Sequence, residues 1–247
     1  MTAIRAEVAG CRFSYETPSN RPLQRIGRCE TLDMVSLVPS QMRYVLDHRD
    51  VMPYVRTYLL GGSAIPEAIR RDIAASGLQV YESYGMTETA SHVAVRRVGI
   101  PQEDFQPLPG VTLSADDNGC LVIDLGEDGQ IVTNDIVRFP GGASFRILGR
   151  ADHVIVTGGK KVHPADIERR LSSLFGDRDI CVTSRPDDFW GQRVVLLVEG
   201  EGDISQSVIA KMKQLLENYE QPKEIITIKS FPRTDNGKII RKQLPWS

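Results

Sequence analysis

The chain has 247 residues, of which 41% are hydrophobic and 25% charged, and its 30 Lys and Arg against 32 Asp and Glu give a formal net charge of −2 at pH 7. These proportions are those of an ordinary folded protein, so a sizeable core can be buried in one large domain or two smaller ones. A near-neutral charge balance argues against a protein whose main partner is nucleic acid or an anionic membrane, because both attract a basic surface.

The cysteines indicate neither a zinc site nor a disulfide framework, because they are far apart and form no CxxC pair. They are Cys11, Cys29, Cys120 and Cys181. No apolar run approaches the roughly 18 residues that a membrane-spanning helix needs, and the first residues lack the pattern of a signal peptide. We therefore expect a cytoplasmic protein without membrane insertion.

Three apolar segments in the first hundred residues each lead into a polar loop. They are residues 32–38, 55–60 and 78–81. Helical spacing follows the first two segments, with Ser40 placed to cap one helix and Pro66 placed in the first turn of the other. Because ligands collect at the carboxyl ends of parallel strands, this pattern predicts a buried, largely parallel sheet with a binding site at its edge.

The pattern of residues changes twice further along the chain. Between residues 101 and 149, Pro/Gly turns separate short strands, which indicates a small antiparallel barrel or meander. Residues 153–247 read as strands alternating with two helices, one over residues 163–176 and one over residues 205–219. This last stretch predicts a separate α+β domain.

The segment from Tyr84 to Thr89 holds a chemically informative set of residues. Tyr84 offers an aromatic plane beside Gly85, which permits close backbone approach. Thr87 then offers a hydroxyl and Glu88 a carboxylate. These are the groups needed to stack a base, hydrogen-bond a phosphate and hold Mg²⁺. The alternative is a strand-to-helix turn in which a threonine is the helix cap.

Four segments downstream carry further candidate residues, each with a plain structural alternative. Asp135 is acceptor-only and could take both hydroxyls of a ribose, or it could be a surface turn acid. Arg150 is followed by Asp152 where the pattern changes, although a surface arginine beside a solvated acid would look the same. Residues 157–161 are glycine-rich and basic but lack the spacing of a P-loop. Lys238 lies in a turn that could be an ordinary hairpin.

Taken together and in this order, these segments resemble the superfamily of AMP-forming adenylating enzymes, which includes acyl-CoA synthetases, nonribosomal-peptide adenylation domains and luciferases. The resemblance covers residues 1–244 and is carried by GGSAIP, YESYGMTET, VTNDIVRF, GRADHVIVTGGKKVHPADIE and PRTDNGKIIRK. It implies an α/β fold in which residues 1–151 are the second half of the large domain, with a parallel sheet region over 1–100 and a β-rich subdomain over 101–149. Residues 152–247 would be the small, mobile α+β C-terminal domain.

The resemblance also implies a two-step ligase reaction that uses ATP, Mg²⁺ and CoA. A carboxylic acid would first attack the α-phosphate of ATP to give an acyl-adenylate and pyrophosphate, and CoA would then displace AMP. Thr87 would contact the α-phosphate and Glu88 would hold Mg²⁺. Lys238 would bridge the carboxylate and phosphate oxygens as negative charge builds up. The implied catalytic residues are therefore Lys238, Thr87 and Glu88.

The other roles implied by the resemblance concern binding and domain movement. The residues implied to bind the nucleotide are Gly61, Tyr84, Gly85, Thr87, Asp135 and Arg150. Tyr84 would stack on adenine, while Asp135 and Arg150 would bind the ribose. Asp152 would be the hinge about which the small domain swings, so that Gly158 and Gly159 line the CoA tunnel in the second step.

Two segments point to a particular subfamily. SLVPSQ at residues 36–41 and SYGMTETASH at residues 83–92 are similar to the o-succinylbenzoate–CoA ligases of menaquinone biosynthesis. Ser91 and His92 would then lie near the acyl pocket, and His92 or a nearby arginine such as Arg96 could meet the succinyl carboxylate. The alternatives are another acid, such as a fatty, aryl or amino acid, or a non-catalytic nucleotide-binding or interaction module derived from the family.

The sequence departs from the superfamily at one motif. Members carry a Ser/Thr/Gly-rich loop ending in Pro-Lys that wraps the β- and γ-phosphates, and this sequence contains no such segment. We therefore expect an N-terminally truncated ligase. An exposed sheet edge and apolar face would follow from that truncation, so association through this face, for example as a homodimer, is expected.

Overall fold

The computed structural model describes residues 2–27, 29–101, 103–234 and 239–245. The sequence-predicted residue Lys238 lies outside the described residues. The chain divides into two compact units, the first formed by Met1–Thr112 with Gly141–Ser144 and the second by Leu113–Pro140 with Phe145–Ser247. The domain boundary near residue 151 stays a prediction.

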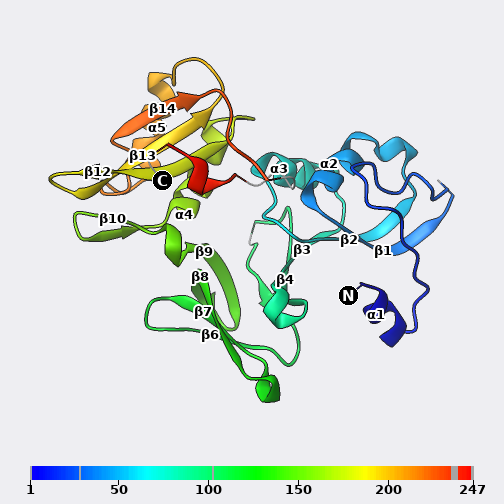
Figure 1. The fold of residues 1–247 in the computed structure, drawn as a ribbon. Coiled ribbons are helices and arrows are strands. Elements are labelled where there is room, and N and C mark those ends of the chain that lie inside the picture. Colours follow the sequence, from blue (N-terminus) through cyan, green and yellow to red (C-terminus); the bar gives the residue numbers. More distant parts are fainter. Residues whose placement is uncertain (1, 28, 102, 235–238, 246–247) are drawn as a thin grey trace. The chain divides into compact units, whose positions relative to one another are not determined.

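The first unit is built on a five-stranded mixed sheet (Figure 1). Its strands, in spatial order, are β1 (Thr31–Leu37), β2 (Tyr54–Leu60), β3 (Val80–Gly85), β4 (His92–Arg97) and β5 (Gln106–Pro107). The first three strands pair in parallel, and β4 and β5 are antiparallel to their neighbours. The parallel strands predicted from the three apolar segments are therefore present, and their carboxyl ends share one edge.

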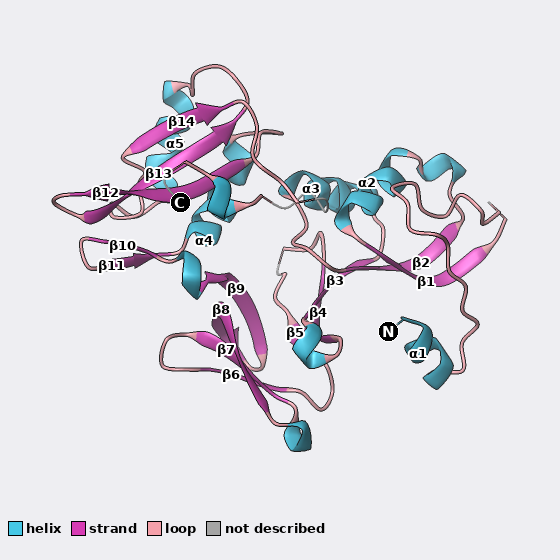
Figure 2. Cartoon of the chain, viewed as in Figure 1, coloured by secondary structure: helices cyan, strands magenta, loops and turns pink. Residues whose placement is uncertain are grey.

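Two helices of the first unit pack into the same core as the sheet and contact each other (Figure 2). The α-helices described in this unit are α1 (Thr2–Val8), α2 (Pro39–Asp47) and α3 (Glu67–Ser76), and the short 3-10 helix η1 (Arg49–Val51) follows α2. Met42 of α2 and Ile73 of α3 are almost fully buried against Leu60 and Val80. Helix α2 begins at Pro39, two residues earlier than a helix capped by Ser40 would, and the backbone N–H of its N-cap residue Val38 donates to Gln41 Oε1 (3.1 Å).

A buried cluster of ion pairs ties α3 to the middle of the sheet. Glu82 of β3 is 5% exposed and accepts hydrogen bonds from Arg70 of α3 and from Arg96 of β4, the Nη2 atom of Arg96 lying 2.6 Å away. Glu103 also pairs with Arg70, and its backbone carbonyl accepts from Arg96 Nη1 (3.1 Å). Two carboxylates therefore balance two guanidinium groups in a site that excludes most water.

The described residues of the second unit form three small sheets and two α-helices. A four-stranded sheet in the order β6 to β9 starts at the boundary of the unit, and a hairpin and a three-stranded sheet follow. Their strands are β6 (Thr112–Ala115), β7 (Cys120–Asp124), β8 (Gln130–Gly141), β9 (Ser144–Arg150), β10 (Ile155–Thr157), β11 (Lys160–Val162), β12 (Ile180–Asp187), β13 (Gly191–Glu199) and β14 (Glu224–Ile228). The four-stranded sheet corresponds to the predicted meander, and the helices are α4 (Pro164–Leu171) and α5 (Gln206–Leu215).

Both faces of the three-stranded sheet are covered. Val194, Leu196 and Val198 face the cluster that contains the buried side chains of α4 and α5. Val195 and Leu197 face the opposite way and pack in a second cluster. Alternate residues of a strand point to opposite faces, so the continuous apolar run over residues 194–198 reflects a strand buried on both sides.

The second helix of this unit is shorter than the sequence predicts. Ser205 caps its beginning, where its hydroxyl accepts from Val208 N (3.4 Å), but the helix ends at Leu215. Leu216 is extended and buried, and Tyr219 lies beyond the helix with 41% of its surface exposed. Within the described ranges, the helices are all too short or too polar to cross a bilayer.

We expect Glu82→Gln to lower the free energy of unfolding of the first unit by about 3 kcal/mol, because it leaves two buried guanidinium groups against one carboxylate. Urea unfolding followed by circular dichroism measures this. Asp33→Asn is the matched control, since the Arg56–Asp33 pair is exposed, with side chains 65% and 83% accessible, and should be nearly neutral. Equal effects of the two substitutions would contradict a structural role for the buried cluster.

Candidate active site

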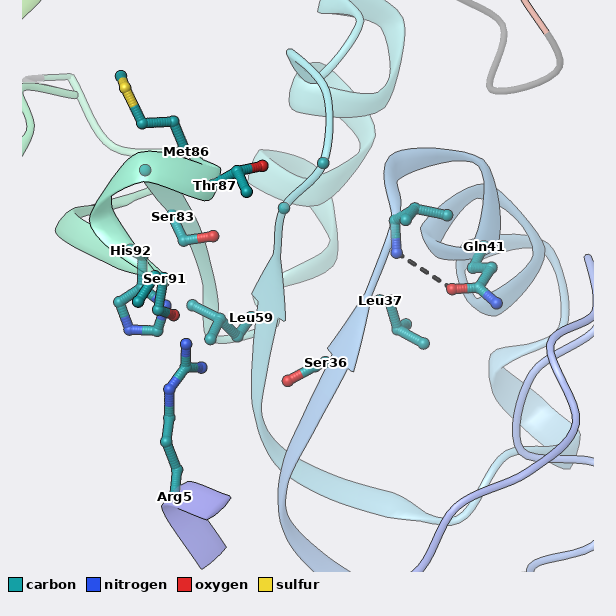
Figure 3. A pocket seen from close by; sticks show the side chains of 15 residues that line it. Arg5, Ser36, Leu37, Gln41, Leu59, Ser83, Met86, Thr87, Ser91 and His92 are labelled. Carbon is teal, nitrogen blue, oxygen red and sulfur yellow. Dashed lines mark hydrogen bonds between the residues drawn. The ribbon is translucent and has the colours of Figure 1, made fainter. Parts of the chain in front are cut away.

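The ends of the three parallel strands surround a cavity of about 590 Å³ in the first unit (Figure 3). This volume is in the range of cofactor and small-ligand sites. Its walls come from the last residues of β1, β2 and β3 and the residues that follow them, together with one residue each from α1, α2 and β4. The lining residues are Arg5, Ser36, Leu37, Val38, Gln41, Leu59, Gly61, Gly62, Ser83, Gly85, Met86, Thr87, Ala90, Ser91 and His92. Five of the predicted site residues, Gly61, Gly85, Thr87, Ser91 and His92, are thus brought together.

Two glycines allow the strand ends to approach one another at this cavity. A Cβ on Gly85 would lie 2.2 Å from the carbonyl oxygen of Ser91 and 2.5 Å from His92 Cα, so no side chain fits there. The register of β3 and β4 shifts between Tyr84 and Gly85, as at a β-bulge. A Cβ on Gly61 would lie 2.7 Å from Ser83 Oγ, whose hydroxyl donates to Leu60 O (3.0 Å).

The turn after β3 is fixed by a threonine, but not by the one expected to bind phosphate. Thr89, at the end of the short helix η2 (Thr87–Thr89), accepts from Met86 N (3.0 Å) and donates to Ser91 O (2.6 Å). Thr87 is exposed and lines the cavity, so its hydroxyl is available to a ligand. In this segment Thr89 therefore stabilises the turn, while Thr87 is the residue placed to contact a ligand. Figure 3 shows Thr87 at the cavity.

An arginine and a histidine face each other across the cavity. The side chain of Arg5 points from α1 towards Ser91 and His92 (Figure 3). Burial, and then the positive charge of Arg5, lower the pKa of His92, so its imidazole is neutral at pH 7. Arg5 supplies positive charge at this end of the cavity, and no pattern around residue 5 predicted this role. Arg96, which the sequence suggested for a substrate carboxylate, is bound to Glu82 and does not line the cavity.

Tyr84 packs against an aromatic and cationic stack. Its ring lies 5.8 Å from that of Phe105, and Arg96 Cζ lies 4.3 Å from the Phe105 ring centroid. This arrangement holds the tyrosine ring through the buried ion-pair cluster. Its stacking on adenine stays a prediction.

Three predicted residues meet in the second unit. Arg150 at the end of β9 lies 3.6 Å from Asp135 Oδ1, and its Nε donates to Asp152 Oδ1 at 3.0 Å. The hydrogen bond from Arg150 lowers the pKa of Asp152, so this carboxylate is ionised at neutral pH. Arg150 thus joins the predicted ribose ligand to the predicted hinge, and their use by one nucleotide remains a prediction.

The predicted CoA-lining glycines form the turn between β10 and β11. Gly158 and Gly159 have φ values of +54° and +75°, which favour glycine. Gly158 N also donates to Trp190 O (2.9 Å), and a Cβ on Gly158 would lie 2.6 Å from Trp190 Cε3. Glycine at position 158 is therefore required by packing as well as by backbone conformation.

The described residues offer few protein ligands for a metal ion. Glu88 is exposed on η2, and no group of three or more His, Cys, Asp or Glu suited to a metal occurs in the part of the chain that the structure describes. Mg²⁺ commonly binds through one or two carboxylates together with substrate phosphates. Glu88 follows the cavity residue Thr87 in the chain, and one carboxylate in this place fits that kind of ion and does not fit a site built from protein ligands alone.

Comparison with known proteins places these features in a family. A model described as "AMP-binding enzyme" matches residues 8–135, more than half of the chain, and one described as "AMP-binding enzyme C-terminal domain" matches residues 166–238. The chain belongs to the AMP-binding enzyme family. The second match extends to Lys238.

Curated members of this family with similar sequences are named 2-succinylbenzoate–CoA ligase. The protein of Lactococcus lactis subsp. lactis (strain IL1403) is 30% identical over 237 residues, which cover 86% of this chain and 51% of the relative. That of Staphylococcus aureus (strain MSSA476) is 28% identical over 243 residues, covering 87% and 49%. The chain spans about half the length of the curated relatives it matches.

Solved structures of AMP-binding enzymes share the fold. An acyl-CoA synthetase (AMP-forming)/AMP-acid ligase II-like protein from Dyadobacter fermentans DSM 18053 is 30% identical, with a TM-score of 0.53 covering 92% of this chain and 68% of that one. The o-succinylbenzoate CoA synthetase of Bacillus subtilis, in complex with the acyl-adenylate intermediate, has a TM-score of 0.70 at 21% identity, covering 85% and 50%. The α/β fold of an adenylating enzyme, predicted from the sequence, is confirmed.

We expect Gly85→Ala to destabilise the first unit by about 2 kcal/mol, because the added Cβ must push the Ser91 backbone away from β3. Thermal unfolding measures the loss. Gly141→Ala is the matched control, because a Cβ there has no neighbour within 4 Å. A Gly85→Ala variant as stable as the Gly141→Ala variant would show that the strand end relaxes freely.

Proposed function

We propose that this chain carries the adenylate- and CoA-handling part of an AMP-forming acid–CoA ligase whose acid is o-succinylbenzoate. The observation that carries the proposal is the cavity at the ends of β1, β2 and β3, where the Thr87 hydroxyl and the Arg5 guanidinium line one space. Membership of the AMP-binding enzyme family and relatives named 2-succinylbenzoate–CoA ligase support it.

In the first step, a carboxylate oxygen of the acid forms a bond to the α-phosphorus of ATP, and the bond from that phosphorus to the pyrophosphate oxygen breaks. The hydroxyl of Thr87 would donate a hydrogen bond to an α-phosphate oxygen. Lys238 would lie between the attacking carboxylate and the phosphate, where its charge offsets the negative charge that accumulates. Glu88 would hold Mg²⁺, which neutralises phosphate oxygens when bound.

Tyr84, with Gly61 and Gly85, would hold the adenine end of the nucleotide. Asp135 would accept hydrogen bonds from the ribose hydroxyls, and Arg150 would hold Asp135 in place. Glycine at positions 61 and 85 leaves room for the nucleotide beside the backbone, since both positions line the cavity.

In the second step, the sulfur of CoA attacks the acyl carbon of the adenylate, the bond from that carbon to the AMP oxygen breaks, and the thiol proton passes to solvent. Gly158 and Gly159 would line the path of the pantetheine arm. Asp152 would be the hinge between residues 1–151 and 152–247, so that Lys238 serves the first step and the glycine turn serves the second.

Arg5 would bind the carboxylate of o-succinylbenzoate that is not activated, beside Ser91 and the neutral His92. A guanidinium group suits this task because its planar fork matches a carboxylate with two hydrogen bonds. A neutral imidazole adds a hydrogen bond without adding charge. An acid with one carboxyl group would leave Arg5 without this partner, so the pocket favours a dicarboxylic acid.

The two half-reactions test the role of Lys238. We expect Lys238→Ala to lower the rate of ATP–pyrophosphate exchange by about a hundredfold or more, because a transition-state charge interaction is lost. Thioester formation from preformed o-succinylbenzoyl-adenylate and CoA should change less than about twofold. Lys242→Ala is the control. Equal losses in both steps would remove Lys238 from the adenylation step, and AMP binding without either half-reaction would favour a nucleotide-binding module.

The acid pocket is tested by comparing acids. We expect Arg5→Met to weaken the binding of o-succinylbenzoate about tenfold or more, the usual cost of losing a charged hydrogen bond. Benzoate, which lacks the second carboxyl group, should be affected little. Arg12→Met, an exposed arginine just beyond α1, is the control, and steady-state KM values with a panel of fatty, aryl and amino acids measure the preference. A similar loss for benzoate would show that Arg5 does not read the second carboxylate.

A further inference from the structure

The chain is paired on both sides of the segment that contains Lys238. Arg233 and Ile239 form an antiparallel bridge, and Ile240 N donates to Pro232 O (2.8 Å). The described backbone therefore enters and leaves this segment as two adjacent strands, like the base of a hairpin. The contacts that hold this base therefore fix the described residues on either side of the segment.

Arg241, three residues after Lys238, is bound to two elements of the second unit at once. Its Nη2 donates to both carboxylate oxygens of Glu168 on α4, at 2.7 and 2.6 Å. Its Nη1 donates to Val182 O on β12 (3.0 Å), while Glu168 Oε1 accepts from Val182 N (2.6 Å). The pair therefore satisfies both backbone groups of Val182 on the edge strand and joins the C-terminal segment to helix and sheet.

This pair is more enclosed than a surface salt bridge. The side chains of Arg241 and Glu168 are 24% and 17% exposed. Burial outweighs the nearby charge of Arg241 and raises the pKa of Glu168. An enclosed, forked pair has one preferred geometry, whereas an exposed pair samples many.

A second arginine holds the other side of the same base. Arg233 Nη2 lies 2.6 Å from Glu199 Oε2 and 2.7 Å from Asp179 Oδ2. Glu199 Oε1 also accepts from Phe231 N (2.7 Å), so this carboxylate binds the chain at two points. Asp179 and Glu199 lie at the paired ends of β12 and β13, where Glu199 N donates to Asp179 O (2.9 Å).

We propose that Arg241 with Glu168, assisted by Arg233 with Glu199, are positioning residues that hold the base of the Lys238 segment for the adenylation step. The inference rests on the proposed role of Lys238. A lysine side chain is long and flexible, so its use as a point charge depends on a fixed backbone. A misplacement of about 1 Å can cost about a hundredfold in rate, so the two anchors matter for catalysis as well as for packing.

The test uses Arg241→Met, which keeps most of the side-chain length and removes every donor. We expect ATP–pyrophosphate exchange with o-succinylbenzoate to fall about ten- to a hundredfold, and thioester formation from the preformed adenylate to change less than about twofold. Arg241→Lys, which keeps the charge but loses the fork, should lie between wild type and Arg241→Met. Arg185→Met, which breaks the half-buried Arg185–Glu224 pair of the same sheet, is the control.

Two further measurements separate positioning from general destabilisation. Hydrogen exchange at Ile240 should become about tenfold faster in Arg241→Met while the β12 and β13 amides stay protected. The Glu168→Gln/Arg241→Met double variant should lose no more ATP–pyrophosphate exchange activity than the more impaired of the two single variants.

The outcomes distinguish this inference from the proposed function. Equal loss of both half-reactions in Arg241→Met, or unchanged adenylation, would overturn the positioning role while wild-type activity upholds the ligase. If the wild type forms no thioester from the preformed adenylate and catalyses no exchange with any acid in the panel, the proposed function fails. In that case, faster hydrogen exchange at Ile240 in Arg241→Met would show that the Arg241–Glu168 pair holds the chain without serving adenylation. The positioning role would then be overturned too.

Discussion

The close contact between Gly85 and the backbone of Ser91 is the constraint on which the rest of the candidate active site depends. With 2.2 Å between an imagined Cβ and the Ser91 carbonyl oxygen, only glycine allows β3 to turn back into β4 at this point. The turn carries Thr87 to the cavity on one side and His92 on the other. A bulkier residue would move both groups together, so the positions of Thr87 and His92 at the cavity are set by the same few atoms.

The strand ends could be predicted from sequence because their signals are local. An apolar run followed by glycine or a polar turn marks the carboxyl end of a parallel strand, and three such ends meet at one edge of a sheet by topology alone. The predicted residues Gly61, Gly85 and Thr87 accordingly line one cavity. Helix ends were less well predicted, since α5 stops at Leu215 where Leu216 turns into the core, a choice made by tertiary packing.

The partners of the arginine side chains could not be predicted, because nothing in the sequence around an arginine indicates which group its guanidinium will contact. Arg96 lies next to the informative segment yet is bound to buried Glu82, while Arg5, far away in the sequence, lines the cavity. The difference arises from which carboxylates the fold buries. Glu82 is buried and its carboxylate needs positive partners, so the nearby arginines form ion pairs with it.

The contact between Arg241 and Cys181 does not activate the cysteine, although the arginine lies beside its thiol. Arg241 Nη1 lies 3.2 Å from Cys181 Sγ, a geometry that elsewhere activates a thiolate. Here burial, followed by the charge of Glu168, raises the pKa of the Cys181 thiol to about 12, so the sulfur stays protonated and the positive charge of Arg241 is directed to Glu168. The arginine is therefore an anchor whose charge is used within the fold.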